Sequence, residues 1–241
     1  MSLLLALALA AVHRPEPGGA EQAEATEPLN FSYVWPDSAE RDPALVAVLR
    51  ARMETARERA LADARESWRD ARANGHELRP YYFTQSWRLA GDSGGLLSLT
   101  AVVETFAGGG PAEGSFETLL WDSTEHRPVP IAELLGPMLP GIEHRYCASL
   151  NEERADIRGD AIRPDPCPPL AEQQLALEDM DGNGRFDRLL VQIEPHMVAP
   201  DEEDPYTPEV DLEAADLTRI PARYRGAFQP IDDRTPSPSD D

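Results

Sequence analysis

The chain has 241 residues, 41% of them hydrophobic, which is enough apolar material for one sizeable domain or two small ones. Its 44 acidic residues outnumber its 22 basic residues and give a formal net charge of −22. So acidic a chain repels nucleic acid and anionic membranes, and it attracts metal ions and basic proteins. We therefore expect no nucleic-acid partner.

The first twelve residues, MSLLLALALAAV, form an apolar run that is too short to cross a bilayer but long enough for a signal-peptide core. The alternative, a buried N-terminal helix, fits poorly because the residues that follow are rich in Pro, Gly and Glu. Such a composition is typical of a linker, predicted here for residues 13–30. We therefore predict a periplasmic or secreted bacterial protein that keeps no membrane span once the signal segment is removed.

Two cysteines, Cys147 and Cys167, are the only ones in the chain. In an exported protein a pair of cysteines most simply forms a disulfide. A zinc site is the alternative, and it fits poorly because no pair of histidines lies near either cysteine. We predict the disulfide.

The first half of the chain predicts a strand, a long helix and a second strand. Residues 31–35 are aromatic and end at Pro36. Asp42 is expected to cap a helix that starts at Pro43 and ends at Asn74-Gly75. Apolar residues recur along it at intervals of three and four, which predicts one buried stripe. Residues 81–89 alternate as in a strand with one buried face.

The motif Gly91-Asp92-Ser93-Gly94-Gly95 follows that strand and resembles the nucleophile motif of chymotrypsin-like serine proteases. A serine nucleophile needs a histidine base and an orienting carboxylate. The nearest upstream histidine, His76, lies in the sequence ANGHEL, which is not the usual setting, and no room is left for a first barrel. The motif is therefore interpreted as a hairpin turn.

Two more strands are predicted on either side of a glycine-rich connection. Residues 97–103 and 115–122 alternate with period two, and several glycines between them permit backbone angles that other residues avoid. The connection is either a flexible hairpin end or a loop that faces a ligand. Its candidate ligand residues are Gly108, Gly109, Gly110, Pro111 and Glu113.

After a helix predicted at residues 140–158, the run Asp179-Met180-Asp181-Gly182-Asn183-Gly184-Arg185-Phe186-Asp187 leads into a strand at residues 188–194. Oxygen ligands fall at loop positions one, three, five, seven and nine, which suits calcium. These are the side chains of Asp179, Asp181, Asn183 and Asp187 and the backbone carbonyl of Arg185.

Position twelve of this loop is Leu190 instead of the bidentate Glu of an EF-hand. A helix-loop-helix is therefore not expected, and the flanking apolar strands resemble the inter-strand calcium loops of integrin-type propeller blades. The alternative is an Asn-Gly hairpin turn with solvated acidic side chains. Calcium is the predicted cofactor.

The last part of the chain is predicted to be an acidic loop at residues 198–211, an edge strand at 209–212 and a short cover at 217–228. Residues 229–241 are polar, rich in Pro, Ser and Asp, and predicted to be a disordered acidic tail.

The runs FAGGGPAEGSFETLLWD, HRPVPIAELL and PHMVAP…PEVDLEAADL resemble the extracytoplasmic domain of lysozyme-sensing anti-sigma-V factors, which also accompanies certain bacterial polysaccharide deacetylases. The resemblance covers residues 31–228 in two parts, 31–95 and 96–228. In that family the Gly-Gly pair is commonly followed by Ala and His, where this chain has Gly110 and Pro111. The resemblance implies an exported domain that binds a component of the cell envelope.

Together these observations predict an α+β fold, with an antiparallel sheet packed by one long and one shorter helix. The predicted function is a non-catalytic, envelope-associated binding domain that calcium stabilises. Its partner is expected to be cell-wall material or a basic envelope protein such as a lysozyme. The alternative is a hydrolase, either serine-type through Ser93 or calcium-assisted, and a purely structural role is a third hypothesis.

Overall fold

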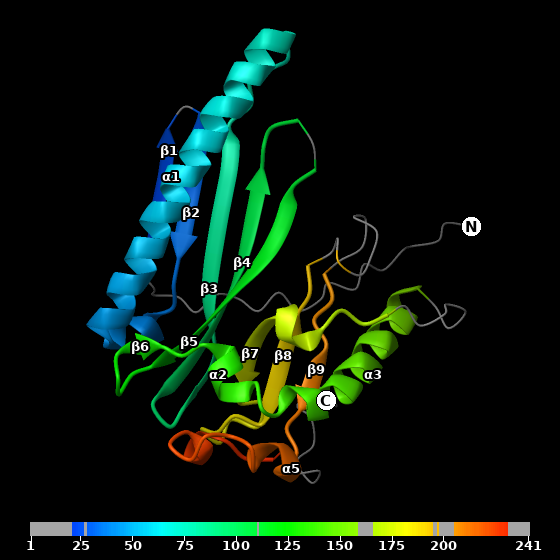
Figure 1. Cartoon of the computed structure of the whole chain (residues 1–241). Helices are drawn as coiled ribbons and strands as arrows, with labels where there is room; N and C mark the ends of the chain where they lie inside the picture. Colours follow the sequence, from blue (N-terminus) through cyan, green and yellow to red (C-terminus); the bar gives the residue numbers. More distant parts are fainter. Residues whose placement is uncertain are drawn as a thin grey trace, which may run out of the picture.

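The structure is a computed structural model, and it describes residues 21–26, 28–109, 111–158, 166–194, 197 and 205–230. Its α+β class agrees with the prediction, but the strands form two sheets and not one. A long helix lies along one side of the larger sheet, and the smaller sheet lies with a shorter helix at the other side (Figure 1). The segment predicted to be a signal peptide, residues 1–12, lies outside the described residues.

The described elements run in chain order as follows. They are β1 (Glu21–Thr26), β2 (Leu29–Val34), a 3-10 helix (Asp37–Arg41), α1 (Pro43–Asn74), β3 (Tyr81–Ser93), β4 (Leu96–Phe106), β5 (Glu113–Asp122), β6 (Arg127–Pro128), α2 (Ile131–Leu135), α3 (Leu139–Arg158), a 3-10 helix (Leu170–Glu172), β7 (Gln174–Glu178), β8 (Arg188–Gln192), β9 (Glu209–Asp211), α5 (Ala214–Leu217) and a 3-10 helix (Arg225–Ala227).

The larger sheet has the strand order β1-β2-β3-β4-β5-β6. Its neighbours are antiparallel except for β2 and β3, which are parallel. A parallel pair needs a long crossover, and α1 supplies it. Within the segment predicted to be a linker, residues 21–26 form β1 and residues 29–30 begin β2, and these strands pair with each other.

Helix α1 begins and ends where its sequence indicates. The Asp42 side chain accepts a hydrogen bond from the Ala44 backbone N–H at 2.9 Å, Pro43 occupies the first turn, and Gly75 ends the helix with φ +68°. Its buried residues lie on one stripe that covers β2 and β3. They are Leu45, Leu49, Met53, Ala60 and Ala64.

The smaller sheet, with strand order β7-β8-β9, packs through β7 on the face of β4 and β5 opposite α1. Polar side chains of the larger sheet make this junction. Ser98 Oγ accepts a hydrogen bond from Leu177 N at 2.9 Å, and Thr100 donates to the side chain of Gln192. Because Leu97 and Leu99, which alternate with Ser98 and Thr100, belong to the core under α1, β4 contributes to both layers.

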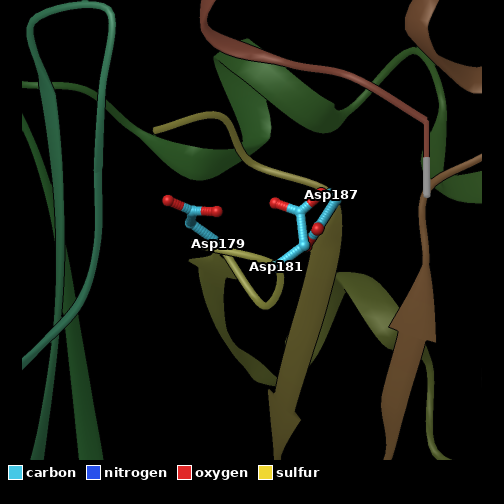
Figure 2. Close-up of side chains that lie close together, drawn as sticks. All are labelled: Asp179, Asp181 and Asp187. Carbon is cyan, nitrogen blue, oxygen red and sulfur yellow. The ribbon is translucent and has the colours of Figure 1, made fainter. Parts of the chain in front are cut away.

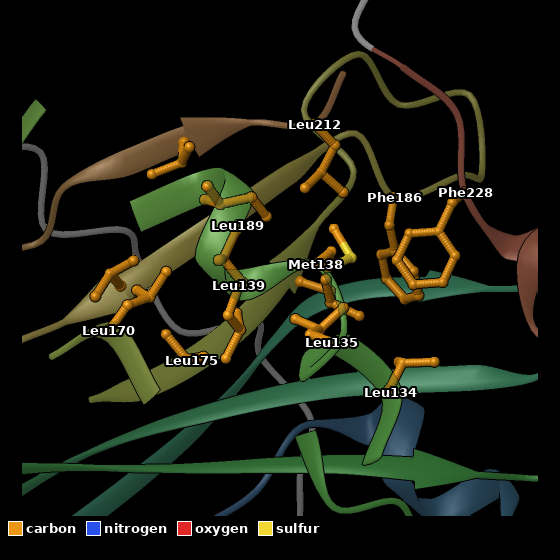
Figure 3. Packing of buried hydrophobic residues seen from close by; sticks show 14 of the residues in the cluster. Leu134, Leu135, Met138, Leu139, Leu170, Leu175, Phe186, Leu189, Leu212 and Phe228 are labelled. Atoms are coloured by element: carbon orange, nitrogen blue, oxygen red, sulfur yellow. The ribbon is translucent and has the colours of Figure 1, made fainter. Parts of the chain in front are cut away.

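The second core lies between the smaller sheet, α2 and α3. Figure 3 shows leucines of the α2 segment meeting those of β7 and β8, with the rings of Phe186 and Phe228 in tilted contact at one end. The disulfide Cys147–Cys167 holds α3 to the chain segment that leads into this core, with a Cα–Cα distance of 5.7 Å. This confirms the predicted disulfide.

The Gly91–Gly95 motif forms the β3–β4 hairpin, as predicted. Gly94 and Gly95 have φ +56° and +83°, which favour glycine. Gly94 also leaves no room for a side chain, because an added Cβ would lie 2.8 Å from Ala227 Cβ. The sequence division at residue 95 therefore falls inside a hairpin.

Within the described ranges, no helix is both long enough and apolar enough to cross a membrane.

Candidate metal centre

The acidic loop of residues 179–187 connects β7 to β8 at the end of the smaller sheet (Figure 2). Gly182 and Gly184 have φ +70° and +83°, conformations that glycine adopts without strain. This folds the loop back on itself, so that oxygen atoms of Asp179, Asp181 and Asp187 all lie within 4.8 Å of one another. The structure thus brings together three of the five residues predicted to hold calcium.

Hydrogen bonds inside the loop hold the first two carboxylates in place. Asp179 accepts the backbone N–H groups of Asn183 at 3.1 Å and Gly184 at 2.8 Å. Asp181 accepts Asn183 N at 3.1 Å and, through its other oxygen, the side-chain amide of Asn183. Each carboxylate oxygen has two lone pairs, so both groups keep capacity for a cation.

Asp187 is the buried member of the cluster. Its side chain is 0% exposed, Oδ1 accepts Met180 N at 3.0 Å, and Oδ2 has no hydrogen-bond partner among the described residues. Its backbone is fixed on both sides, because its N–H donates to Glu178 O and its carbonyl accepts Leu212 N. A buried carboxylate oxygen without a partner is costly unless it is protonated or binds a cation.

Electrostatics around Asp187 agree with an excess of negative charge. Burial raises the pKa of the Asp187 carboxyl, and the Asp181 and Asp179 carboxylates raise it further. Hydrogen bonds from the backbone N–H groups of Met180 and Asp181 lower it, but they do not outweigh the rise. Burial likewise raises the pKa of Glu178 to about 7, and nearby Glu209 adds to that shift. A divalent cation bound by Asp187, Asp181 and Asp179 would offset the negative charge that adds to the Asp187 shift.

The other predicted ligands are placed differently. Asn183 is exposed and directs its amide nitrogen toward Asp181. The Arg185 guanidinium is cationic and has no acceptor atom, so a cation would use the backbone carbonyl of this residue. Leu190, at position twelve, is buried within β8 and supplies no oxygen side chain. The loop therefore offers a site of oxygen ligands, which fits a hard cation such as calcium.

The C-terminal segment also reaches the loop, which the sequence did not indicate. Gln229 N donates to Phe186 O at 3.0 Å, and Gln229 Nε2 donates to Asp181 Oδ2 at 2.9 Å. Phe186 N donates to Ala227 O at 2.9 Å. The tail prediction is therefore wrong at Gln229, whereas residues 231–241 lie outside the described residues. Gln229 opens a run of polar residues, so composition alone could not place it against the loop.

The glycine-rich connection forms the β4–β5 hairpin and meets the end of α1. Gly108 has φ +90°, and its added Cβ would lie 3.2 Å from Arg79 Cβ. Gly108 and Gly109 line a cavity of about 280 Å³ together with Trp68 and His76. Pro111 and Glu113 are exposed away from its lining, and Gly110 lies outside the described residues.

The hydroxyl of Ser93 is committed to a structural contact. The side chain is 3% exposed, and Oγ donates to Ala227 O at 2.8 Å. His126 lies elsewhere, where its Nδ1 is 2.9 Å from Asp42 Oδ2 in a cavity of about 290 Å³. This pairing ties the β5–β6 turn to the start of α1, and the distance along the chain kept it out of reach of sequence reasoning.

A scan against protein-family models finds no match, and neither does a search of curated proteins. The fold is similar to the crystal structure of a DUF3298 family protein from Pseudomonas aeruginosa PAO1, with a TM-score of 0.50 and 18% sequence identity over 89% of this chain and 95% of that one. A DUF3298 family member from Bacteroides fragilis matches with a TM-score of 0.49 and 13% identity over 84% and 92%. The first of these likenesses supports the fold alone.

Proposed function

We propose that this chain is an exported, non-catalytic binding domain of the bacterial cell envelope, stabilised by calcium at the Asp179–Asp187 loop. The observation that carries the proposal is the buried Asp187 carboxylate, whose Oδ2 has no hydrogen-bond partner among the described residues. Two further carboxylates, those of Asp179 and Asp181, lie close to it. The disulfide is compatible with export, because such bonds persist in oxidising compartments.

Calcium would act on the smaller sheet as a clamp. Asp179 directly follows β7, Asp187 directly precedes β8, and Asp181 contacts Gln229 of the C-terminal segment. A cation bound by all three carboxylates would therefore join two strands and the C-terminal segment. Its effect belongs to stability, and the proposal requires no chemistry at the metal.

Calcium is expected to raise the melting temperature of chelator-stripped protein, because a ligand that binds only the folded state stabilises it. At a free concentration of 100 times the dissociation constant, the gain is about 2.7 kcal/mol. Calorimetric titration combined with thermal melts measures both quantities. Magnesium is expected to bind more weakly, since it demands a stricter octahedral geometry.

Asp181→Asn should weaken calcium binding by about tenfold or more, because one of three carboxylate charges is lost. Asp156→Asn, on the exposed face of α3, is the matched control and should leave the titration unchanged. Absence of heat and of any melting shift in the unmodified protein would reduce the loop to a turn and refute the calcium part of the proposal.

The partner proposed is a basic envelope protein such as a lysozyme, or cell-wall material. The supporting observation is the net charge of −22, which attracts cationic proteins and repels polyanions. Calcium-loaded protein is expected to bind hen lysozyme in an interaction that weakens with salt but survives at about 0.15 M ionic strength, where the Debye length is about 8 Å. Surface plasmon resonance would measure it.

Cytochrome c, which is also basic, is the control for unspecific attraction. Equal binding of the two proteins, abolished at the same ionic strength, would contradict a specific partner role. The alternative function, a hydrolase through Ser93, has less support because that hydroxyl is buried and donates to Ala227 O.

A further inference from the structure

A cleft separate from the acidic loop lies between α1 and the larger sheet. Helix α1 packs on β2 and β3, and the cleft is lined by residues of α1, β3 and β5. The cleft has a volume of about 430 Å³, within the range of small-molecule sites. Its wall includes Val48, Arg52 and Arg59 of the helix, and its floor includes Gln85 of β3 and Glu117 of β5.

The floor contains a buried donor without an acceptor. Gln85 is 2% exposed, and its Nε2 has no hydrogen-bond partner among the described residues. Buried amide groups are nearly always hydrogen-bonded, so an unpaired one facing a cleft calls for an explanation. A ligand that placed a carbonyl oxygen at the floor would provide the missing acceptor.

The wall contains an unbalanced positive charge. Arg52 is paired, because its Nη1 lies 3.3 Å from Glu117 Oε2, and its guanidinium lies 5.6 Å from the centroid of the Trp87 ring. Arg59 lines the same cleft two helical turns further on and makes no ion pair within the described ranges. In a chain of net charge −22, this cleft therefore has a local charge of opposite sign.

These groups select for a particular ligand chemistry. A guanidinium binds carboxylate in a planar, bidentate manner, and the apolar side chains of Val48 and Ala56 suit small alkyl groups. A polyanion is disfavoured by the charge of the whole protein, so a single carboxylate fits best. The second polar requirement is an acceptor for Gln85.

We propose that this cleft binds a small molecule with one carboxylate, held by Arg59, and an amide carbonyl, held by Gln85, which is the chemistry of a peptide C-terminus. The proposal rests on the binding role proposed above and names its ligand class. Because Gln85 Nε2 has no solvent contact, binding requires side chains at the floor to shift. Arg52 lies over Trp87, so the Trp87 indole reports that shift.

N-acetyl-alanyl-alanine is the probe, and the assigned indole N–H signal of Trp87 in a nitrogen-15 NMR spectrum is the readout. The signal is expected to move saturably as the peptide is added. The peptide with an amidated C-terminus should bind at least about tenfold more weakly, and propionate, which lacks the amide, should also bind more weakly.

Variants separate the two polar contacts. Arg59→Gln is expected to weaken peptide binding by about tenfold or more. Arg50→Gln removes the same charge from an exposed position of α1 outside the cleft and should keep the wild-type affinity. Gln85→Met, which preserves side-chain volume, should abolish the preference for the peptide over propionate.

Three results would overturn this ligand assignment. They are no saturable shift up to about 10 mM peptide, equal weakening by Arg50→Gln and Arg59→Gln, or equal affinity for peptide and propionate in the unmodified protein. The titration is made with calcium and with chelator. A failed peptide titration beside a successful calcium titration would refute the ligand class alone, whereas a failed calcium titration leaves the cleft testable.

Discussion

Replacing Phe186 with alanine is expected to lower the free energy of unfolding by about 4 kcal/mol, the typical loss when a buried phenylalanine is truncated. The ring is 0% exposed and packs on Phe228 with a centroid distance of 5.4 Å. It also fills the space over Gly91, where an added Cβ would lie 2.7 Å from Phe186 Cε1. Three separate parts of the chain therefore lose a common contact.

Urea unfolding followed by circular dichroism measures this loss. Tyr82→Ala, which removes an aromatic side chain that is 47% exposed, is the control and should change stability by less than about 1 kcal/mol. Because Phe186 lies next to Asp187, the variant is also expected to bind calcium more weakly. A loss no larger than that of Tyr82→Ala would show that the C-terminal segment is not packed as described.

Asp42→Ala is expected to destabilise the protein by about 3 kcal/mol, from a lost helix cap and an orphaned buried donor. Asp42 is 5% exposed, and it caps α1 through Ala44 N. Its Oδ2 accepts the indole N–H of Trp121 at 2.8 Å, and Trp121 is 1% exposed. Without the carboxylate, that buried N–H has no acceptor.

The same carboxylate should make stability depend on pH. Burial acts to raise the pKa of Asp42, but hydrogen bonds from Trp121 and His126 outweigh it and hold the pKa below its usual value. The stabilisation by the Asp42 carboxylate is therefore fully present at neutral pH, which lies above its pKa in the unfolded chain. It is lost as the pH falls through the lower pKa of the folded protein.

Comparison of Asp42→Asn with the unmodified protein tests this dependence. The stability difference should be largest at neutral pH and shrink in acid, and Asp37→Asn, at an exposed position nearby, should show no such trend. A difference that is independent of pH would mean that the charge of Asp42 does not contribute.

Elements with a strong local signal could be predicted from the sequence. The bounds of α1 follow from Asp42, Pro43 and Gly75, whose preferences act within one helical turn. The β3–β4 turn follows from Gly94 and Gly95, and the spacing of acids from Asp179 to Asp187 indicated a cluster that the structure brings together.

What the sequence did not reveal depends on long-range contacts. Nothing local indicates that β2 pairs parallel to β3 or that the strands split into two sheets. The contact between Gln229 and the acidic loop could not be predicted either, because Gln229 lies in a segment whose composition resembles that of a disordered tail. Gln85 lies between Phe83 and Trp87 on the buried face of β3, so its lack of a partner appears only once Arg52 and Glu117 are placed around it.

The attachment of the C-terminal segment to the middle of the chain governs when the protein can finish folding. Ser93 bonds to Ala227 across 134 residues, and Tyr224 donates to Asp122 across 102. Contacts so distant in sequence make folding slow, because a large loop must close before they form. When only about 200 residues have left the ribosome, the C-terminal segment that completes these contacts is still missing, so the domain cannot finish folding. Secretion through a narrow pore requires an unfolded polypeptide, and the time before the C-terminal segment is synthesised would allow it.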